Sequence, residues 1–122
     1  MRRDAQPLPG TARVVDADQL RLDGSRTIRF EGESYGSGVS FFRVQFEPGQ
    51  GVAQHRHPYS ETWVVLSGAA TFLVGEESQG GLTDQTIVVP PDTWHGFTNN
   101  GDVTLSMMCI HASPRIIQEW RP

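Results

Sequence analysis

Two histidines one residue apart, followed four residues later by a glutamate, are the residues in this sequence with the clearest chemical potential. They are His55, His57 and Glu61, in the stretch HRHPYSE. On a β-strand, residues i and i+2 face the same side about 6.5–7 Å apart, so both imidazoles can lean toward one ion. On a helix the same spacing turns the two side chains about 200° apart. The histidine pair therefore predicts a metal site only if it lies on a strand or in an extended loop.

A third imidazole is available at His95, which follows a short apolar run and a Pro-Pro turn. If residues 58–60 form a turn, Glu61 begins the next strand and folds back beside the histidine pair, with Trp63 on the same face. Three neutral imidazoles and one carboxylate suit a divalent transition metal ion, namely Fe, Mn, Ni, Co or Zn, better than a site that prefers thiolates. The sequence therefore offers a four-residue metal site.

The elements that must position these side chains have the patterns of short β-strands. Runs rich in β-branched and aromatic residues alternate with glycine and proline turn signals, and no stretch between residues 38 and 113 has the periodicity of a three-turn amphipathic helix. This pattern predicts one all-β domain, a barrel or a sandwich. We expect strands at 39–46, 62–66, 70–74, 86–89, 95–98 and 103–110, and a glycine-rich loop at 75–81.

The two ends of the chain have weaker patterns. Residues 1–38 are expected to form an N-terminal arm, rich in proline and glycine over its first twelve residues, followed by short edge strands that cover a sheet. The barrel is expected over residues 39–113. Residues 114–122 contain Ile116, Ile117 and Trp120, an apolar set that must dock on its own barrel or on a partner.

Composition narrows the classes of function. The 122 residues suit one domain, and 37% hydrophobic with 20% charged residues is ordinary for a soluble globular protein. A net charge of −4 with scattered basic residues gives no footprint for nucleic acid. No apolar run approaches the roughly 20 residues of a membrane span. The single Cys109 cannot form an intrachain disulfide, which fits a cytoplasmic protein.

The spacing of the candidate ligands also resembles a known family. The stretch G-x5-H-x-H-x3-E-x6-G from Gly49 to Gly68 is similar, position for position, to the first motif of the cupin superfamily. The stretch D-x5-P-x-D-x2-H-x3-N from Asp84 to Asn99 is similar to the second motif, with Asp84 and Asp92 where that motif has glycine. Aspartate tolerates unusual backbone angles better than most residues, so we expect both positions to lie in turns.

This resemblance implies the fold and the ligand set. It implies a small antiparallel barrel of the cupin, double-stranded β-helix or jelly-roll type, with His55, His57, Glu61 and His95 as the metal ligands. The ending IHASPRIIQEW resembles the tails of small single-domain bacterial cupins. Such cupins often form homodimers in which terminal strands pack on the neighbour's sheet or exchange with it, so the resemblance implies a homodimer here.

Several other side chains are candidates for a substrate pocket. Trp63 and Phe97 are in phase with Glu61 and His95 on their strands, although most aromatic residues of a small domain belong to its core. Arg43 and Gln45 could contact an anionic ligand if their face of the first long strand lines the cavity, or they could face solvent. His111 could be an extra ligand, a general base, or a hydrogen-bonded histidine at the end of a strand.

The predicted site limits the chemistry more than the substrate. A six-coordinate metal with four protein ligands leaves two adjacent positions for water, O2 or a bidentate molecule. Because Glu61 cancels one charge of a divalent ion, the site favours anionic chelating small molecules, such as an enolate or a hydroxy acid. The sequence thus predicts a metal-dependent enzyme, dioxygenase-like or isomerase-like, that acts on a small chelating metabolite. A non-catalytic cupin that binds a small ligand is the alternative.

Overall fold

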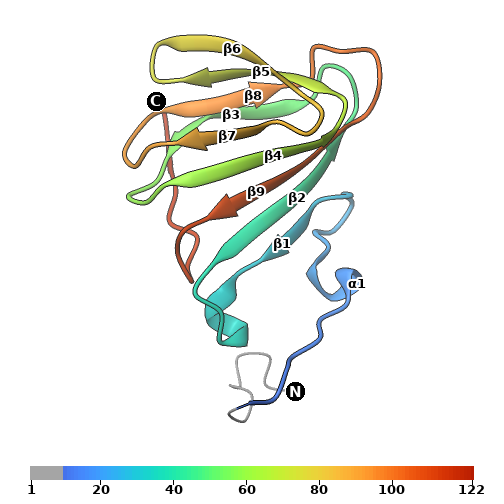
Figure 1. Ribbon diagram of the computed structural model, residues 1–122, viewed down its shortest axis with the longest axis vertical. Coiled ribbons are helices and arrows are strands. Elements are labelled where there is room, and N and C mark those ends of the chain that lie inside the picture. The colour runs from blue at the N-terminus through green and yellow to red at the C-terminus, as the bar shows by residue number, and fades with distance from the viewer. Residues whose placement is uncertain (1–9) are drawn as a thin grey trace.

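A computed structural model describes residues 10–122, which form two five-stranded antiparallel sheets (Figure 1). The predicted all-β fold is confirmed. The only helices in the described part are the short α1 (Ala17–Leu20) and the 3-10 helix η1 (Gly32–Tyr35), and neither approaches the length that a membrane crossing needs. In spatial order, the first sheet contains β1 (Ile28–Phe30), β2 (Ser40–Phe46), β9 (Leu105–His111), β4 (Glu61–Ser67) and β7 (Thr86–Val89). The second contains β10 (Glu119–Trp120), β3 (Gly51–Arg56), β8 (His95–Thr98), β5 (Ala69–Val74) and β6 (Glu77–Leu82).

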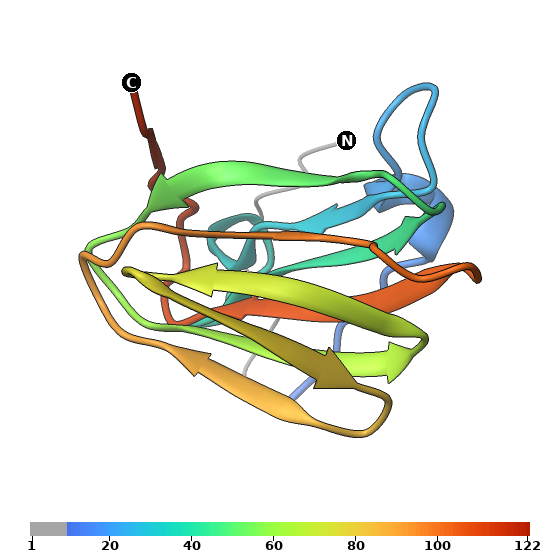
Figure 2. The ribbon, with the colours of Figure 1, turned by 90° about the horizontal axis from the view of Figure 1, so that it is seen from above.

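From β2 onward the chain crosses from one sheet to the other at nearly every connection (Figure 2). The one exception is the hairpin of β5 and β6, which stays within the second sheet. In the N-terminal region, β1 pairs with β2 at the edge of the first sheet, and residues 1–9 of the predicted arm lie outside the described residues. This alternation places segments that are consecutive in the sequence, such as β3 and β4, in different sheets.

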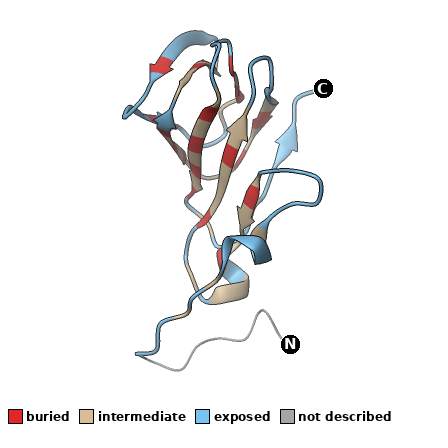
Figure 3. Ribbon diagram, turned by 90° about the vertical axis from the view of Figure 1, so that its right-hand side faces the viewer, coloured by how far each residue is buried: buried red, intermediate tan, exposed pale blue. Residues whose placement is uncertain are grey.

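The core lies between the sheets and follows from the two-residue period of the strands. In β9, every second residue from Leu105 to His111 is buried, and in β4 the buried positions are Glu61, Trp63 and Val65 (Figure 3). Inward-facing apolar side chains from both sheets therefore close one continuous core. Its fully or almost fully buried members are Val44, Trp63, Val65, Ala70, Phe72, Ile87, Val89, Phe97, Leu105, Met107 and Cys109.

Four turn positions of the two cupin-like motifs have left-handed backbone conformations. Their φ angles are 91° at Gly49, 84° at Gly68, 72° at Asp84 and 56° at Asp92. The prediction that both aspartates occupy turns is confirmed. The backbone N–H of Asp92 donates to the carbonyl of His57 at 2.7 Å, so this turn is tied directly to the histidine segment.

The glycine-rich loop predicted at 75–81 is wrong, because most of it belongs to β6, which pairs with β5. Glycine content suggested a loop, but at Gly81 it serves packing, since the ring of the fully buried Phe72 occupies the space that a Cβ would need. The neighbouring Gly80 has no such restriction, because its nearest atom would lie 4.0 Å from an added Cβ. One glycine in this strand is therefore required by its cross-strand neighbour and the other is not.

This difference can be tested by two adjacent substitutions. Gly81→Ala should lower the free energy of unfolding by about 1–3 kcal/mol, because the added methyl group overpacks a core that cannot yield. Gly80→Ala should leave stability unchanged or raise it slightly, since alanine restricts the unfolded chain. Urea denaturation followed by tryptophan fluorescence measures both, and equal effects of the two substitutions would contradict the packing explanation.

Candidate metal centre

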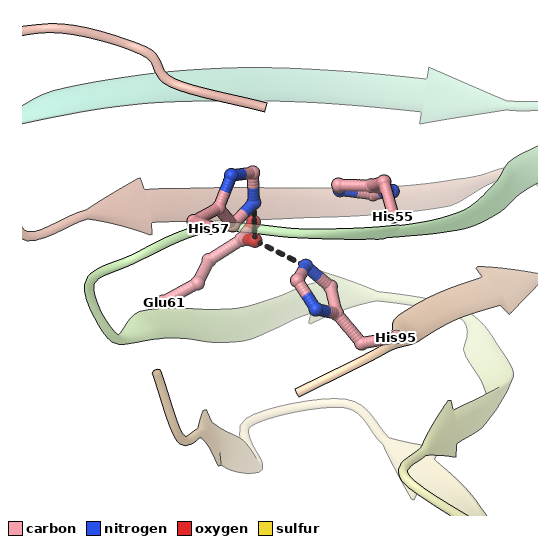
Figure 4. A group of neighbouring side chains, drawn as sticks. All are labelled: His55, His57, Glu61 and His95. Atoms are coloured by element: carbon pink, nitrogen blue, oxygen red, sulfur yellow. Dashed lines mark hydrogen bonds and ion pairs between the residues drawn. The ribbon is translucent and has the colours of Figure 1, made fainter. Parts of the chain in front are cut away.

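The four predicted ligands come from both sheets and meet at one buried point (Figure 4). His55 lies in β3 and His57 directly after it, Glu61 begins β4, and His95 begins β8. One donor atom of each lies within 4.8 Å of the others. Zinc–ligand bonds of about 2.0–2.2 Å place two donors at most about 4.4 Å apart, so only small side-chain shifts separate this arrangement from a loaded site.

A β-bulge in β3 brings the first histidine into the cavity. Val52 pairs with Phe97 and His55 pairs with His95, so β3 has one residue more than β8 between these pairs. With a strict two-residue period, Val52 and His55 would face opposite sides of the sheet, and the extra residue turns both toward the cavity. Gly96 permits the bulge, because a Cβ there would lie 2.6 Å from the carbonyl oxygen of Val52.

The hydrogen bonds of the three histidines leave one nitrogen of each ring free for a metal. Nδ1 of His55, His57 and His95 lies 2.8, 2.7 and 2.7 Å from the carbonyl oxygens of Ala53, Ile117 and Thr93. A carbonyl only accepts, so each Nδ1 carries a hydrogen, and each ring in its neutral form presents the lone pair of Nε2. Such a partner behind a metal-binding histidine fixes both the tautomer and the ring orientation.

The two carboxylate oxygens of Glu61 have different partners. Oε1 lies 3.0 Å from Nε2 of both His57 and His95, whereas Oε2 accepts a hydrogen bond of 2.9 Å from the indole of Trp63. Nε2 of His111 lies 3.5 Å from the same Oε2. Oε1 and the lone pairs of Nε2 are all acceptors, and their convergence in a buried site calls for a cation among them. The residues present therefore fit a divalent metal ion.

The pKa shifts favour the forms that bind metal. Burial lowers the pKa of His55 to about 4, so this ring is neutral near pH 7. Burial alone would raise the pKa of Glu61, but hydrogen bonding from the surrounding imidazoles, that of His111 foremost, outweighs burial and holds that pKa below its ordinary value. A carboxylate and neutral imidazoles are the protonation states that metal binding requires.

A cavity of about 230 Å³ opens beside the ligands. His55, Glu61 and His111 form its titratable polar end, and most of the remaining wall is apolar. The other lining residues are Thr27, Phe42, Val44, Phe46, Val52, Phe97, Cys109, Gln118 and Trp120. The larger depression of about 780 Å³ between residues 18–27 and the β2–β3 turn contains none of the ligands, so we do not connect it with the metal chemistry.

The four predicted pocket residues differ in their positions. Phe97 lines the cavity, whereas Trp63 is fully buried, stacks on Phe72 and donates to Glu61, so it supports a ligand from behind. Arg43 and Gln45 alternate along β2 with the residues that line the cavity, which places them on the opposite face of the sheet. The structure thus brings the four candidate ligands and Phe97 together and leaves the two polar residues outside.

Three further residues at the site carry no strong signal in the sequence. Tyr59 stacks on His57, with ring centroids 5.0 Å apart, and its hydroxyl lies 2.6 Å from Nδ1 of His111. Burial raises the pKa of Tyr59, so the phenol keeps its proton. A carboxylate only accepts, so the pair of His111 and Glu61, with Nε2 3.5 Å from Oε2, needs the hydrogen of His111 on Nε2, and Nδ1 then accepts from the phenol. This arrangement fits the reading of His111 as a hydrogen-bonded histidine. Trp120 and the carbonyl of Ile117 come from the C-terminal tail.

The family model for the cupin domain matches residues 42–111, a segment that runs from β2 to β9 and contains all four candidate ligands. The chain therefore belongs to the cupin family, and the family predicted from the two motifs is confirmed.

Two relatives from Streptomyces match this part of the chain. Over 68 residues it is 35% identical to Protein SchB of Streptomyces halstedii and 37% identical to Polyketide synthase CurC of Streptomyces cyaneus. Each match covers 55% of this chain, and 49% and 44% of the two relatives respectively. The matched segment thus spans about half the length of these curated relatives.

Solved structures share the fold over a longer range. A protein with a double-stranded β-helix domain from Klebsiella pneumoniae has a TM-score of 0.71 and 22% identity, with 92% of this chain and 99% of that chain covered. An oxalate oxidase has a TM-score of 0.70 and 24% identity, with 82% of this chain and 56% of that chain covered. These similarities confirm the double-stranded β-helix fold.

The ligand assignment predicts different effects for two buried histidines. His95→Ala removes a metal donor and should abolish binding of Zn²⁺ or Ni²⁺ at stoichiometric concentration. His111→Ala removes only a hydrogen-bond partner of Glu61, so one ion per chain should still bind, about 10–100-fold more weakly. Isothermal titration calorimetry measures both affinities. Metal binding by His95→Ala as tight as that of the wild type would refute the assignment.

The metal-free protein should lose stability as the pH falls from about 6.5 toward 4. The pKa of His55 is about 4 in the fold and about 6.5 in the unfolded chain, so the unfolded state holds more protons in this interval and unfolding becomes easier. The contribution is fully present above pH 6.5. Urea midpoints at pH 7 and pH 5 in the presence of a chelator should differ more for the wild type than for His55→Asn. Equal differences would contradict the shift.

Proposed function

We propose that this cupin is a metal-dependent enzyme whose substrate is a small, mostly apolar molecule with two chelating oxygens. The observation that carries the proposal is the joining of an acceptor-rich ligand cluster to an apolar cavity. His55 and Glu61 mark one end of the cavity, and Phe42, Phe46 and Phe97 line its wall. A polar end that fixes orientation and an apolar wall that holds the body of the ligand are typical of small-molecule sites.

The size and polarity of the cavity select among chelating molecules. At about 230 Å³ it is smaller than the roughly 300–1,000 Å³ of typical ligand pockets, which favours a compact molecule. Oxalate, the substrate in the name of one structural relative, is a dianion with no apolar carbon skeleton to contact this wall. A polyketide, the product class in the name of CurC, carries ketones at alternate carbons and can enolise to a chelating 1,3-dicarbonyl. We therefore infer a 1,3-dicarbonyl or a phenol with an adjacent oxygen.

The chain's own residues have distinct parts in this proposal. The Nε2 atoms of the three histidines and Oε1 of Glu61 would hold a divalent Fe, Mn, Ni, Co or Zn ion. Trp63 holds the other oxygen of Glu61 in place. The aromatic side chains at 42, 46 and 97 would orient the substrate and keep bulk water away from it. When bound, the metal would supply Lewis acidity toward an enolate and, if it is iron or manganese, reactivity toward O2.

One observation favours the alternative, a cupin that binds its ligand without turnover. The titratable groups that line the cavity are His55, Glu61, Cys109 and His111. Two are candidate ligands, His111 is engaged with Tyr59 and Glu61, and burial raises the pKa of Cys109 well above its ordinary value. No free general base is therefore evident among the described cavity residues. A homodimer and a cytoplasmic location, both suggested by the sequence, remain predictions.

The cavity can be tested separately from the metal by filling it. Val52→Phe should reduce binding of a 1,3-diketone at least about tenfold, equivalent to 1.4 kcal/mol, because the new ring occupies the space beside the ligands. The metal content should not change. Val88→Phe is the matched control, since Val88 is also in a strand but is 66% exposed. Enolate absorbance on titration measures affinity, and elemental analysis measures metal content.

The same protein, loaded with Fe²⁺ or Mn²⁺, distinguishes the enzyme from the binder. Oxygen uptake and product chromatography across 1,3-diketones, catechols and flavonoids should identify turnover of at least one class. Oxalate should give none. Tight binding of a diketone without uptake or product would favour the non-catalytic alternative, and no binding by any member of the panel would refute the proposed ligand class.

A further inference from the structure

The C-terminal tail leaves β9 in the first sheet and passes across the end of the molecule to the free edge of β3 in the second sheet (Figures 1 and 2). We name residues 116–120 the strap. The strap is anchored on both sides. Before it, Arg115 forms an ion pair with Glu33, with an N–O distance of 2.8 Å, and at its start the N–H of Ile116 donates to Glu31. At its end, Glu119 forms an ion pair of 2.8 Å with Arg56.

Between these anchors, the backbone of Ile117 contacts the metal site through both of its polar groups. Its carbonyl accepts a hydrogen bond of 2.7 Å from Nδ1 of His57, and its N–H donates to the hydroxyl of Tyr59 at 3.1 Å. Tyr59 in turn stacks on His57 and donates to His111. One residue of the strap therefore orients a candidate ligand directly and the neighbouring imidazole through Tyr59.

His57 differs from the other two histidine ligands in the origin of its partner. The carbonyls that hold His55 and His95 belong to Ala53 and Thr93, each two residues earlier in the same local segment. Those two contacts form wherever the local backbone forms. The partner of His57 lies 60 residues away in the sequence, so its orientation requires that the tail be docked.

We propose that residues 116–120 act as a strap whose docking sets the metal affinity of the site through His57. The inference rests on the proposed metal site, and it assigns Ile117, through its backbone, and Tyr59 as positioning residues. Loss of a hydrogen-bond partner behind a metal ligand typically weakens metal binding about 10–100-fold. The undocked strap should therefore leave a folded barrel that still binds metal, but weakly.

The strap is also held weakly enough to detach while the barrel stays folded. Both residues of β10 are exposed, the side chain of Ile117 is 49% exposed, and the anchoring ion pairs lie at the surface, where such pairs contribute little. Segments of this kind open locally at low free-energy cost. Gln118 and Trp120 line the cavity, so detachment removes part of the cavity wall and loosens His57 at the same time. Access of ligand to the cavity and retention of the metal are thus linked.

The test compares a chain that ends at Arg115 with the full chain by calorimetric titration of Zn²⁺. The truncated chain should bind the ion about 10–100-fold more weakly. A chain that ends at Arg121 is the matched control, because it is also shortened but keeps the whole strap, so its affinity should stay within about threefold of the wild type. Unchanged affinity in the chain that ends at Arg115, or an equal loss in the chain that ends at Arg121, would overturn the proposal.

A spectroscopic measurement separates positioning of His57 from a general loss of structure. In the zinc-loaded full chain with 15N-labelled histidine, the hydrogen-bonded Nδ1–H groups of His55, His57 and His95 should each give a resonance. In the truncated chain only the resonance of His57 should be lost or strongly shifted. Retention of all three, or an equal change in all three in a folded chain, would overturn the proposal.

A second variant decides the matter if the truncated chain does not fold. Ile117→Pro keeps the full-length chain but removes the N–H that donates to Tyr59 and constrains the backbone at the carbonyl that accepts from His57, so it should weaken zinc binding several-fold, with a selective change in the His57 resonance. Unchanged affinity and spectrum would overturn the proposal. Failure of the proposed function would give a different result. If the full-length wild type does not bind zinc, the proposed metal site is wrong, whereas the strap proposal is tested by the difference in affinity between the variants and a wild type that binds zinc.

Discussion

Three imidazole nitrogens and one carboxylate oxygen, all hydrogen-bond acceptors, converge on a single buried point between the two sheets. Buried acceptors that face one another are unfavourable unless a proton or a cation lies between them. The surrounding groups maintain this convergence. Backbone carbonyls hold the Nδ1–H of each histidine, and Trp63 and His111 engage the second oxygen of Glu61. The residues at this point therefore fit a positive ion.

The fold serves this constraint through a few local departures from regular strand geometry. The bulge in β3 turns His55 inward, and Gly96 provides the space that the bulge needs. The left-handed turn at Asp92 bonds to the carbonyl of His57. Because the chain alternates between the sheets, the connection from His57 to Glu61 joins the second sheet to the first, and the candidate ligands come from both sheets. The packing of the two sheets sets the distance between them, and these local features direct the candidate ligands toward one another.

The same arrangement separates two tasks that the site must perform. The polar end of the cavity holds the candidate ligands, while aromatic and aliphatic side chains from β2, β3 and β8 form the wall. The C-terminal tail contributes to both, since the carbonyl of Ile117 contacts His57 and Trp120 lines the cavity beside His55. A tail that the sequence describes only as an apolar set in need of a docking site is thus part of the site itself.

The sequence alone determined the β-class, most of the long strands, the family and the four candidate ligands, because strand periodicity and motif spacing are local properties of the chain. It could not place Arg43 and Gln45, since alternation along a strand does not tell which face meets the cavity. It misassigned residues 77–81 as part of a loop, where the requirement for Gly81 comes from the ring of Phe72 on the neighbouring strand. The role of Ile117 was beyond its reach for a physical reason: a backbone carbonyl is common to every residue type, and only tertiary structure decides which imidazole it meets.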